Sequence, residues 1–207
     1  MGRKEGKLFV ITGPSGTGKG SICKELLKEI DNEFSVSMTT REAREGEVEG
    51  RDYFFVSEEE FLKNVEKGNF LEHANVFEHL YGTPKDMVEK QLAKGRNVIL
   101  DIDVQGALQV KTAMPEAILI FLLPPSLKEL RHRLEKRGTE KIDVIELRLS
   151  KALTEIKLIG EYDYYVVNDD IDKALAEVRC IITAEKCRVP EKVKPIIKQY
   201  EQEERGE

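Results

Sequence analysis

Residues 8–27 read LFVITGPSGTGKGSICKELL, and this stretch decides the fold. The apolar run from Leu8 to Thr12 has the length of a buried strand, and the glycine-rich residues 13–20 follow it. Apolar side chains then recur at helical spacing, beginning with Ile22 and Leu26. Glycines let successive backbone N–H groups turn inward, and a helix N-terminus adds positive potential. The order of strand, loop and helix therefore predicts a phosphate-binding loop, with Lys19 reaching the terminal phosphates.

The residue after Lys19 departs from the usual pattern of such a loop. Gly20 stands where a Ser or Thr normally places its hydroxyl on Mg²⁺, and Ser21 is one position further along. Either Ser21 reaches the metal or water takes that place, and the sequence leaves both open. A plain glycine-rich turn with a solvated lysine is the alternative, which the flanking strand and helix disfavour.

The composition limits the class of protein. The chain has 207 residues, 40% of them hydrophobic and 35% charged, with a formal net charge of −6. This favours one globular core with inserted segments, and it argues against binding nucleic acid through the overall field. Three cysteines without metal-ligand spacing, and no apolar segment long enough to cross a membrane, are typical of a protein of the cytoplasm. The oligomeric state stays open.

Three further runs have strand length, and helical patterns lie between them. These runs are Asn97 to Asp103, Ala117 to Leu123 and Tyr164 to Asn168. Strands that alternate with helices predict an α/β fold, in which helices cover both faces of a parallel sheet. Further helices are expected over Ser126 to Arg137, Ile142 to Ile159 and Ile171 to Cys187.

The segment before Asn97 has a different character and is rich in Arg, Gly and Tyr, so we expect an inserted subdomain there. Short strands are predicted near Val36 and Tyr53. One helix is predicted with Ser57 as its N-cap, Glu60 closing a capping box and Gly68 as its end. A second is predicted with Thr83 as N-cap, Pro84 in its first position and Gly95 at its end.

Several motifs occur together along the chain: GPSGTGKGS (13–21), SVSMTTR (35–41), REGEVEGRDYFFV (44–56), EHA (72–74), YGTP (81–84), VILDIDVQG (98–106), FLLPPS (121–126), KRGTE (136–140) and VVNDD (166–170). With them the sequence resembles the guanylate kinase family from Leu8 to Cys187. The resemblance implies a phosphate-loop nucleoside-monophosphate kinase that moves the γ-phosphoryl group of ATP, with Mg²⁺, onto GMP or dGMP. It implies a core of about 1–35, 96–125 and 160–187, a GMP-binding subdomain of about 36–95, a lid of about 126–159 and a charged tail, 188–207.

The same resemblance assigns residues to three sites. The implied ATP site consists of Gly13, Pro14, Ser15, Gly16, Thr17, Gly18, Lys19, Gly20, Ser21 and Asn168. The implied GMP site consists of Ser37, Arg41, Arg44, Tyr53, Glu72, Tyr81, Thr83 and Asp103. The implied catalytic residues are Lys19, Arg41, Asp101, Arg133, Arg137 and Arg148. Ser21 and Asp101 are the candidates for the metal, through water if not directly.

These roles make chemical sense. Guanidinium forks match phosphate oxygens, and tyrosine hydroxyls donate to them without adding charge. Guanine presents N–H donors at N1 and N2, so the carboxylates of Glu72 and Asp103 would select it over adenine. Asp101 has an alternative interpretation as the partner of a nearby arginine such as Arg41. A non-catalytic binding module and a kinase for another nucleoside monophosphate are the competing functions.

Overall fold

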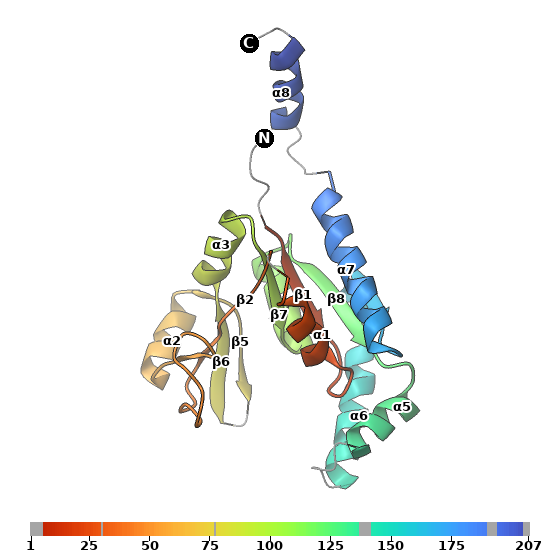
Figure 1. The fold of residues 1–207 in the computed structure, drawn as a ribbon. Helices are drawn as coiled ribbons and strands as arrows, with labels where there is room; N and C mark the ends of the chain where they lie inside the picture. Colours follow the sequence, from red (N-terminus) through yellow and green to blue (C-terminus); the bar gives the residue numbers. More distant parts are fainter. Residues whose placement is uncertain (1–5, 30, 77, 137–141, 190–193, 205–207) are drawn as a thin grey trace.

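The computed structural model describes residues 6–29, 31–76, 78–136, 142–189 and 194–204. Within these ranges the centre is a five-stranded sheet in the order β2-β7-β1-β8-β9, in which every neighbouring pair is parallel (Figure 1). Its strands are β1 (Leu8–Thr12), β2 (Asn32–Phe34), β7 (Asn97–Asp101), β8 (Ile118–Leu123) and β9 (Tyr164–Val167). The predicted parallel α/β sheet is confirmed.

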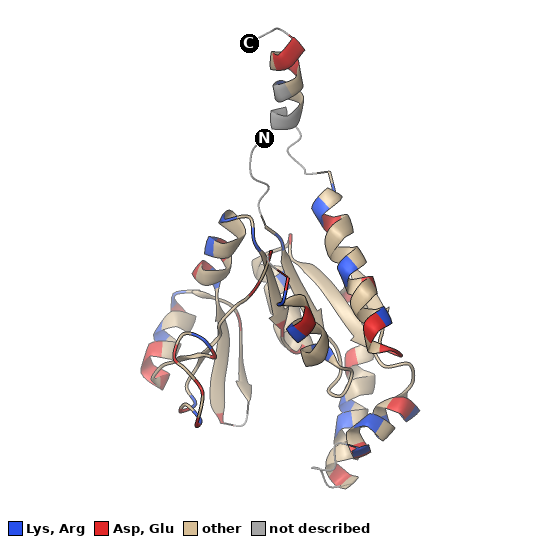
Figure 2. Cartoon of the chain, viewed as in Figure 1, with Lys and Arg blue, Asp and Glu red and all other residues tan. Residues whose placement is uncertain are grey.

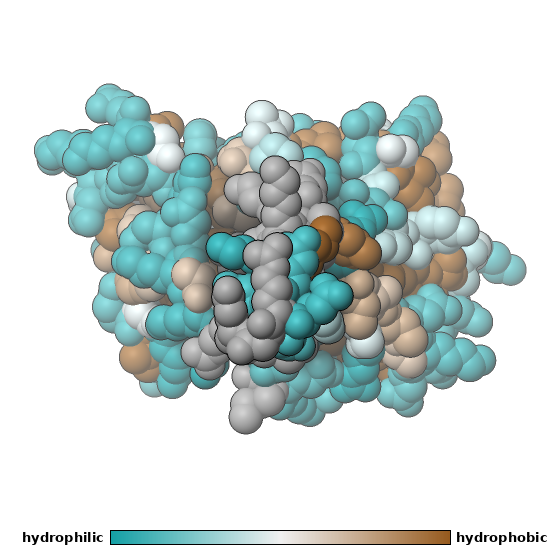
Figure 3. Space-filling model, turned by 90° about the horizontal axis from the view of Figure 1, so that it is seen from above, coloured by the Kyte–Doolittle hydropathy of each residue, from teal (hydrophilic) through white to brown (hydrophobic). Residues whose placement is uncertain are grey.

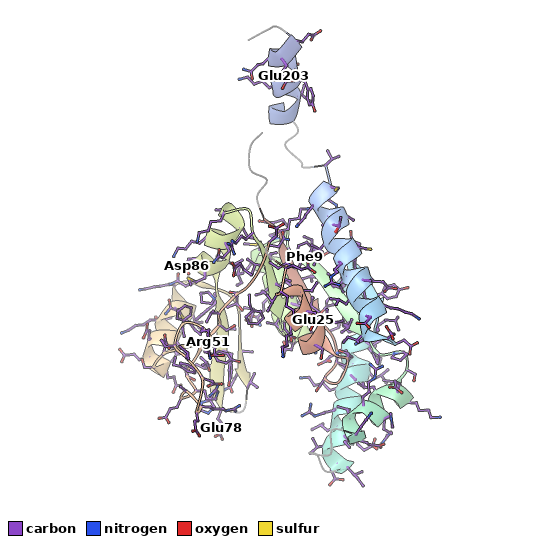
Figure 4. All side chains as sticks on the ribbon, in the orientation of Figure 1. Phe9, Glu25, Arg51, Glu78, Asp86 and Glu203 are labelled. Atoms are coloured by element: carbon purple, nitrogen blue, oxygen red, sulfur yellow. The ribbon has the colours of Figure 1, made fainter. Side chains whose placement is uncertain are left out.

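Alternate residues of the three central strands, β7, β1 and β8, face two separate hydrophobic clusters. Phe9 and Ile11 of β1 pack on the face that carries α1 (Lys19–Leu26) and α7 (Ile171–Cys187). Leu8 and Val10 pack on the opposite face, with α3 (Lys85–Ala93) and α4 (Val104–Ala113). Phe9 lies between the sheet and α7 in Figure 4. Because both faces are covered, the strands read as continuous apolar runs rather than as alternating ones.

A second, mixed sheet stands beside the first, in the order β4-β3-β6-β5 (Figure 1). Its strands are β3 (Met38–Thr39), β4 (Phe54–Phe55), β5 (Phe70–Val76) and β6 (His79–Pro84), and α2 (Glu58–Glu66) packs on it. The cap predicted for α2 is confirmed, since Ser57 Oγ accepts a 3.2 Å hydrogen bond from the backbone N–H of Glu60. The strand predicted near Val36 is replaced by β2 and β3, on either side of that residue.

The predicted start of α3 is wrong. Thr83 belongs to β6, Pro84 is the N-cap and the helix begins at Lys85. The strand continues because Phe70 pairs with Pro84 across the ladder. The Thr83 hydroxyl is directed at Glu72 rather than at the first turn of the helix. A cap-like sequence was therefore overridden by a contact with a neighbouring strand.

Two more element ends differ from the prediction. Strand β7 ends at Asp101, because Asp103 is the N-cap of α4 and accepts a 2.9 Å hydrogen bond from the N–H of Gly106. Helix α6 (Ile142–Ile156) is shorter than expected, and a 3₁₀ turn over Ile159–Glu161 follows it. Together with α5 (Leu127–Lys136), α6 forms a small cluster of its own below the central sheet in Figure 1.

The surface carries both signs of charge. Basic and acidic residues are interspersed along the helices in Figure 2. Seen from above, hydrophilic side chains cover most of the molecule, with apolar patches between them (Figure 3). Helix α8 (Lys194–Glu204) stands apart from the other elements in Figure 1. Among the described residues, no helix is long and apolar enough to cross a membrane.

Candidate active site

The phosphate-binding loop follows β1 at the carboxyl edge of the central sheet. Gly13, Gly16 and Gly18 have φ angles of +137°, +95° and +92°, a region that side chains other than glycine rarely adopt. A β-carbon at position 13 would lie 2.2 Å from the carbonyl oxygen of Leu122. The loop is braced from within, because Thr17 is buried and its Oγ1 donates to the carbonyl of Pro14 at 2.8 Å. The glycines thus permit both the turn and its close packing against β8.

Lys19 folds back over this loop. Its Nζ donates to the carbonyls of Gly13 at 2.6 Å and Pro14 at 3.2 Å. Burial lowers the pKa of Lys19, although the nearby carboxylate of Asp101 opposes that shift. A partly desolvated ammonium that has only carbonyl acceptors gains strongly from an anion in the same loop.

Asp101 ends β7 beside the loop. Burial raises its pKa, and the positive charge of Lys19 opposes the increase. A β-carbon on Gly20 would lie 3.6 Å from Asp101 Oδ2, so the position that normally carries a metal-binding hydroxyl faces this carboxylate. The alternative pairing of Asp101 with Arg41 is wrong, because the guanidinium of Arg41 binds Glu47.

Glu47, which was not among the residues predicted for the site, organises the loop that carries the predicted arginines. Arg41 Nη2 donates to both Glu47 oxygens, at 2.8 and 3.0 Å, and the backbone N–H of Arg44 donates to Glu47 Oε2 at 2.8 Å. The hydrogen bond that Arg41 donates to Glu47 holds the pKa of Arg41 above its ordinary value. A carboxylate within six residues of two arginines was the available signal.

The two predicted tyrosines lie against the same arginine. The rings of Tyr53 and Tyr81 meet edge to face, with centroids 5.9 Å apart. The guanidinium carbon of Arg41 is 5.5 Å from the centre of the Tyr53 ring. Burial raises the pKa of Tyr53, so its hydroxyl stays protonated and can donate. Arg44 is exposed, and Ser37 is half-buried with its carbonyl accepting from Phe54 N–H at 2.9 Å.

Glu72 and Thr83 form a buried polar pair on the second sheet. The register of β5 against β6 shifts between Phe70 and Glu72, so that Glu72 comes to lie opposite Thr83. Such an irregularity re-aims the side chains that follow it. Thr83 Oγ1 donates to Glu72 Oε1 at 2.6 Å, and Glu72 is only 7% exposed. Burial raises the pKa of Glu72, and the hydrogen bond from Thr83 partly offsets it.

Asp103 and Glu72 approach the same point of α4. A β-carbon at Gly106 would lie 3.1 Å from Glu72 Oε2 and 3.5 Å from Asp103 Oδ1. The nearby charge of Asp103 also contributes to the raised pKa of Glu72. The two predicted guanine-reading carboxylates are therefore brought together from different elements.

Two of the predicted lid arginines contact the core. Arg148 of α6 donates to the hydroxyl of Ser15 in the phosphate loop. Arg133 of α5 pairs with Glu129 at 2.8 Å and donates to the carbonyl of Asn168 at 2.9 Å. Arg137 lies outside the described residues.

Asn168 closes the loop from the side of β9. It is buried, and its Nδ2 donates to the carbonyl of Thr17 at 2.7 Å.

Glu155 of α6 is a charged group near the loop that was not among the predicted site residues. Burial raises its pKa, and Lys151 and Lys19 oppose the shift. Ser21 is exposed at the start of α1.

The described residues offer no cluster of three or more His, Cys, Asp or Glu side chains that could hold a metal ion. Asp101 faces Gly20 at the loop, and its carboxylate is of the oxygen-ligand type that Mg²⁺ accepts. Phosphate oxygens and water commonly supply most ligands of Mg²⁺. This donor set fits a cation that arrives with a nucleotide.

The site has a phosphate loop at the edge of a parallel sheet, a second sheet with a buried polar pair, and arginines on a separate helical pair. These features define a phosphate-loop nucleoside-monophosphate kinase. The family model for guanylate kinase matches residues 5–185. The chain belongs to the guanylate kinase family, and phosphoryl transfer from ATP to GMP is its reaction.

Individual relatives agree with this placement. The guanylate kinase of Caldanaerobacter subterraneus subsp. tengcongensis is 54% identical over 188 residues, covering 90% of this chain and 91% of the relative. That of Clostridioides difficile is 49% identical over 97% of this chain and 98% of its own length. The crystal structure of guanylate kinase from Anaplasma phagocytophilum superposes with a TM-score of 0.71 at 37% identity, covering 91% of this chain and 90% of that one.

Proposed function

We propose that GMP binds between the second sheet and the amino end of α4, with Glu72 and Asp103 accepting the N1 and N2 hydrogens of guanine. The observation that carries this is the buried Glu72–Thr83 pair, placed against Gly106. Ser37 and Thr83 would contact O6 and N7. AMP offers no hydrogen at N1, so it would leave the carboxylates unpaired, at a cost of about 1–3 kcal/mol each.

The GMP phosphate is proposed to bind Arg41, Arg44, Tyr53 and Tyr81. In support, the guanidinium of Arg41 lies over the ring of Tyr53, and that ring contacts the ring of Tyr81. Tyrosine hydroxyls and guanidinium groups then converge on one dianion, and the phosphate needs no general base because it is itself an anionic nucleophile.

ATP is proposed to bind residues 13–21, with Asn168 near adenine and Lys19 on the terminal phosphates. Asp101 would hold Mg²⁺ through water, and the metal would neutralise charge on the phosphate oxygens. Arg133, Arg137 and Arg148 would add positive charge around the transferring group, which is the main need of phosphoryl transfer.

We further propose that residues 36–95 close over GMP and residues 126–159 close over ATP, in a protein of the cytoplasm. Closure would align both nucleotides and exclude water. Small-angle scattering with GMP and a non-hydrolysable ATP analogue should report compaction, and unchanged dimensions would count against closure.

A coupled ADP-release assay with GMP, dGMP, AMP, UMP and dTMP tests the base selection. Activity restricted to GMP and dGMP supports the proposal. Comparable activity with AMP would refute the role of Glu72 and Asp103, and no activity at all would favour a binding module.

A further inference from the structure

One face of α4 makes two contacts with β5, next to the residue that caps the helix. Asp103 caps the helix, Gly106 lies against Glu72, and Gln109 reaches the backbone of His73. These positions are three residues apart, so they lie close to one line along the helix surface. The adjoining stripe of the helix buries Ala107 and Val110 in the core. Helix α4 is therefore anchored in the core while it touches the strand that carries Glu72.

The contact of Gln109 with His73 consists of two reciprocal hydrogen bonds. His73 N–H donates to Gln109 Oε1 at 3.1 Å, and Gln109 Nε2 donates to the carbonyl of His73 at 3.2 Å. Strand β5 is at the edge of its sheet, so its outer backbone groups lack a strand partner. The amide of Gln109 supplies one acceptor and one donor, as a neighbouring strand would.

We propose that Gln109 is a positioning residue for guanine recognition, because it fixes the peptide that adjoins Glu72. Glu72 precedes His73, and its carboxylate is buried close to Gly106. A displacement of β5 away from α4 would move this carboxylate away from Asp103, and the two could no longer meet one guanine edge. A binding group acts at full strength only when the surrounding contacts hold it in place. The inference rests on the proposed role of Glu72.

The two hydrogen bonds between Gln109 and His73 also connect two parts of the molecule that have separate sheets. Gln109 belongs to a helix packed on the central sheet, and His73 belongs to the second sheet. Residues 73 and 109 are 36 positions apart, and both hydrogen bonds are in an exposed part of this junction. These two hydrogen bonds therefore act by fixing the position of β5 against α4, and not by burying apolar surface.

The experiment compares three variants, Gln109→Ala, Gln109→Glu and Thr112→Ala, in kinetics with GMP and with inosine monophosphate, which lacks the 2-amino group. Thr112 is the control, because it is exposed on the same helix and its hydroxyl donates to the carbonyl of Leu108. Gln109→Ala should raise the KM for GMP between about 5-fold and about 30-fold and lower the preference for GMP over inosine monophosphate. The KM for ATP should change little.

Gln109→Glu keeps an acceptor for His73 N–H but loses the donor to its carbonyl, so its effect should be intermediate or close to that of Gln109→Ala. Hydrogen exchange at the His73 amide should be faster in Gln109→Ala than in Thr112→Ala. This measurement and the Glu variant keep the test decisive should the alanine variant fold poorly. An unchanged preference for GMP in folded Gln109 variants overturns the proposal.

Combination with Glu72→Gln separates this inference from the proposed function. In that background, Gln109→Ala should not lower the preference for GMP any further, because the group it positions is already altered. A full additional loss overturns the positioning role. If Glu72→Gln alone leaves the preference unchanged, the guanine-reading role itself is wrong and the inference falls with it. A loss in Glu72→Gln with none in Gln109→Ala overturns the inference alone.

Discussion

Thr83 Oγ1 lies 2.6 Å from Glu72 Oε1, and this bond joins β6 to β5 inside a region where Thr83 is fully buried. Burial raises the pKa of Glu72, and the Thr83 hydroxyl offsets only part of that effect. A carboxylate whose pKa is raised on folding makes the folded state less stable as pH rises through that pKa. The charged carboxylate of Glu72 therefore makes the folded protein less stable above that pKa.

Glu72→Gln should raise stability and weaken guanine selection together. At neutral pH the substitution removes a desolvated charge while keeping an acceptor for Thr83, and a gain of about 1 kcal/mol would raise Tm by about 2–4 °C. The gain should be larger at pH 8 than near pH 5, because the raised pKa lets protonation of Glu72 relieve the charge as pH falls. Thermal unfolding at both pH values checks this, and an equal gain at both would contradict the electrostatic explanation.

Glu47→Ala should weaken GMP binding without affecting ATP. Glu47 fixes the guanidinium of Arg41 and the backbone N–H of Arg44, so its removal leaves the loop that carries these two arginines to be ordered by the substrate. We expect the KM for GMP to rise by about 5-fold to 30-fold and the KM for ATP to stay the same. Glu45→Ala is the matched control, as an exposed carboxylate in the same loop. Identical kinetics in the two variants would show that Glu47 does not organise the site.

Lys19→Ala should reduce kcat by about 10²-fold to 10³-fold, because the variant loses the ammonium that we propose to meet the terminal phosphates. Burial lowers the pKa of Lys19, so the side chain is charged at a cost, and its removal should leave Tm unchanged or slightly higher. Steady-state kinetics and thermal unfolding measure the two effects. Lys24→Ala, an exposed substitution on α1, serves as the control. A large fall in Tm would mean that Lys19 is structural.

Gly20→Ser should reduce the Mg²⁺ concentration needed for half-maximal activity. The new β-carbon would be 3.6 Å from Asp101 Oδ2, an ordinary contact, and its hydroxyl would stand near the proposed metal position. Gly20→Ala makes the same backbone change without the hydroxyl. Both should stabilise α1 by about 0.5–1 kcal/mol. Titrations of Mg²⁺ that coincide for the two variants would argue against a metal beside Gly20.

Tyr164→Phe should destabilise the protein by about 1–2 kcal/mol at pH 7 without changing activity. Glu185 is 2% exposed and accepts hydrogen bonds from Tyr164 at 2.7 Å and from Lys7 at 2.9 Å. Burial alone would raise the pKa of Glu185, but these hydrogen bonds outweigh it and the pKa is lowered. The stabilisation is therefore present above the unfolded pKa and is lost as pH falls through the folded one. Denaturant unfolding at pH 7 and pH 3 should show a smaller difference between variant and parent at pH 3.

The local features of this chain were readable from its sequence. Residues 8–27 predict the phosphate loop because strand length, positive-φ glycines and helical periodicity are all short-range properties. The strands Ala117 to Leu123 and Tyr164 to Asn168 were recognisable for the same reason, and the structure has them to within a residue of each end. The cap at Ser57 also depends only on its neighbours in the chain.

The predicted ends of two elements were wrong, because a side-chain hydrogen bond competed with the local pattern. Thr83 has the sequence of a helix cap, but its hydroxyl goes to Glu72, eleven residues earlier. Asp103 continues an apolar run, yet it caps α4 and so ends β7 early. Thr83 thus bonds across two strands instead of capping α3, whereas Asp103 ends β7 through a local capping bond to Gly106.

The sequence by itself determined the parallel sheet, the glycine loop and the family, because each depends on patterns within a few tens of residues. Only the tertiary structure decided the irregular register that turns Glu72 toward Thr83, the pairing of Arg41 with Glu47 in place of Asp101, and the two hydrogen bonds of Gln109 with His73. These contacts join side chains and backbone groups that come together only in the folded chain. The periodicity and the motifs of the sequence therefore do not predict them.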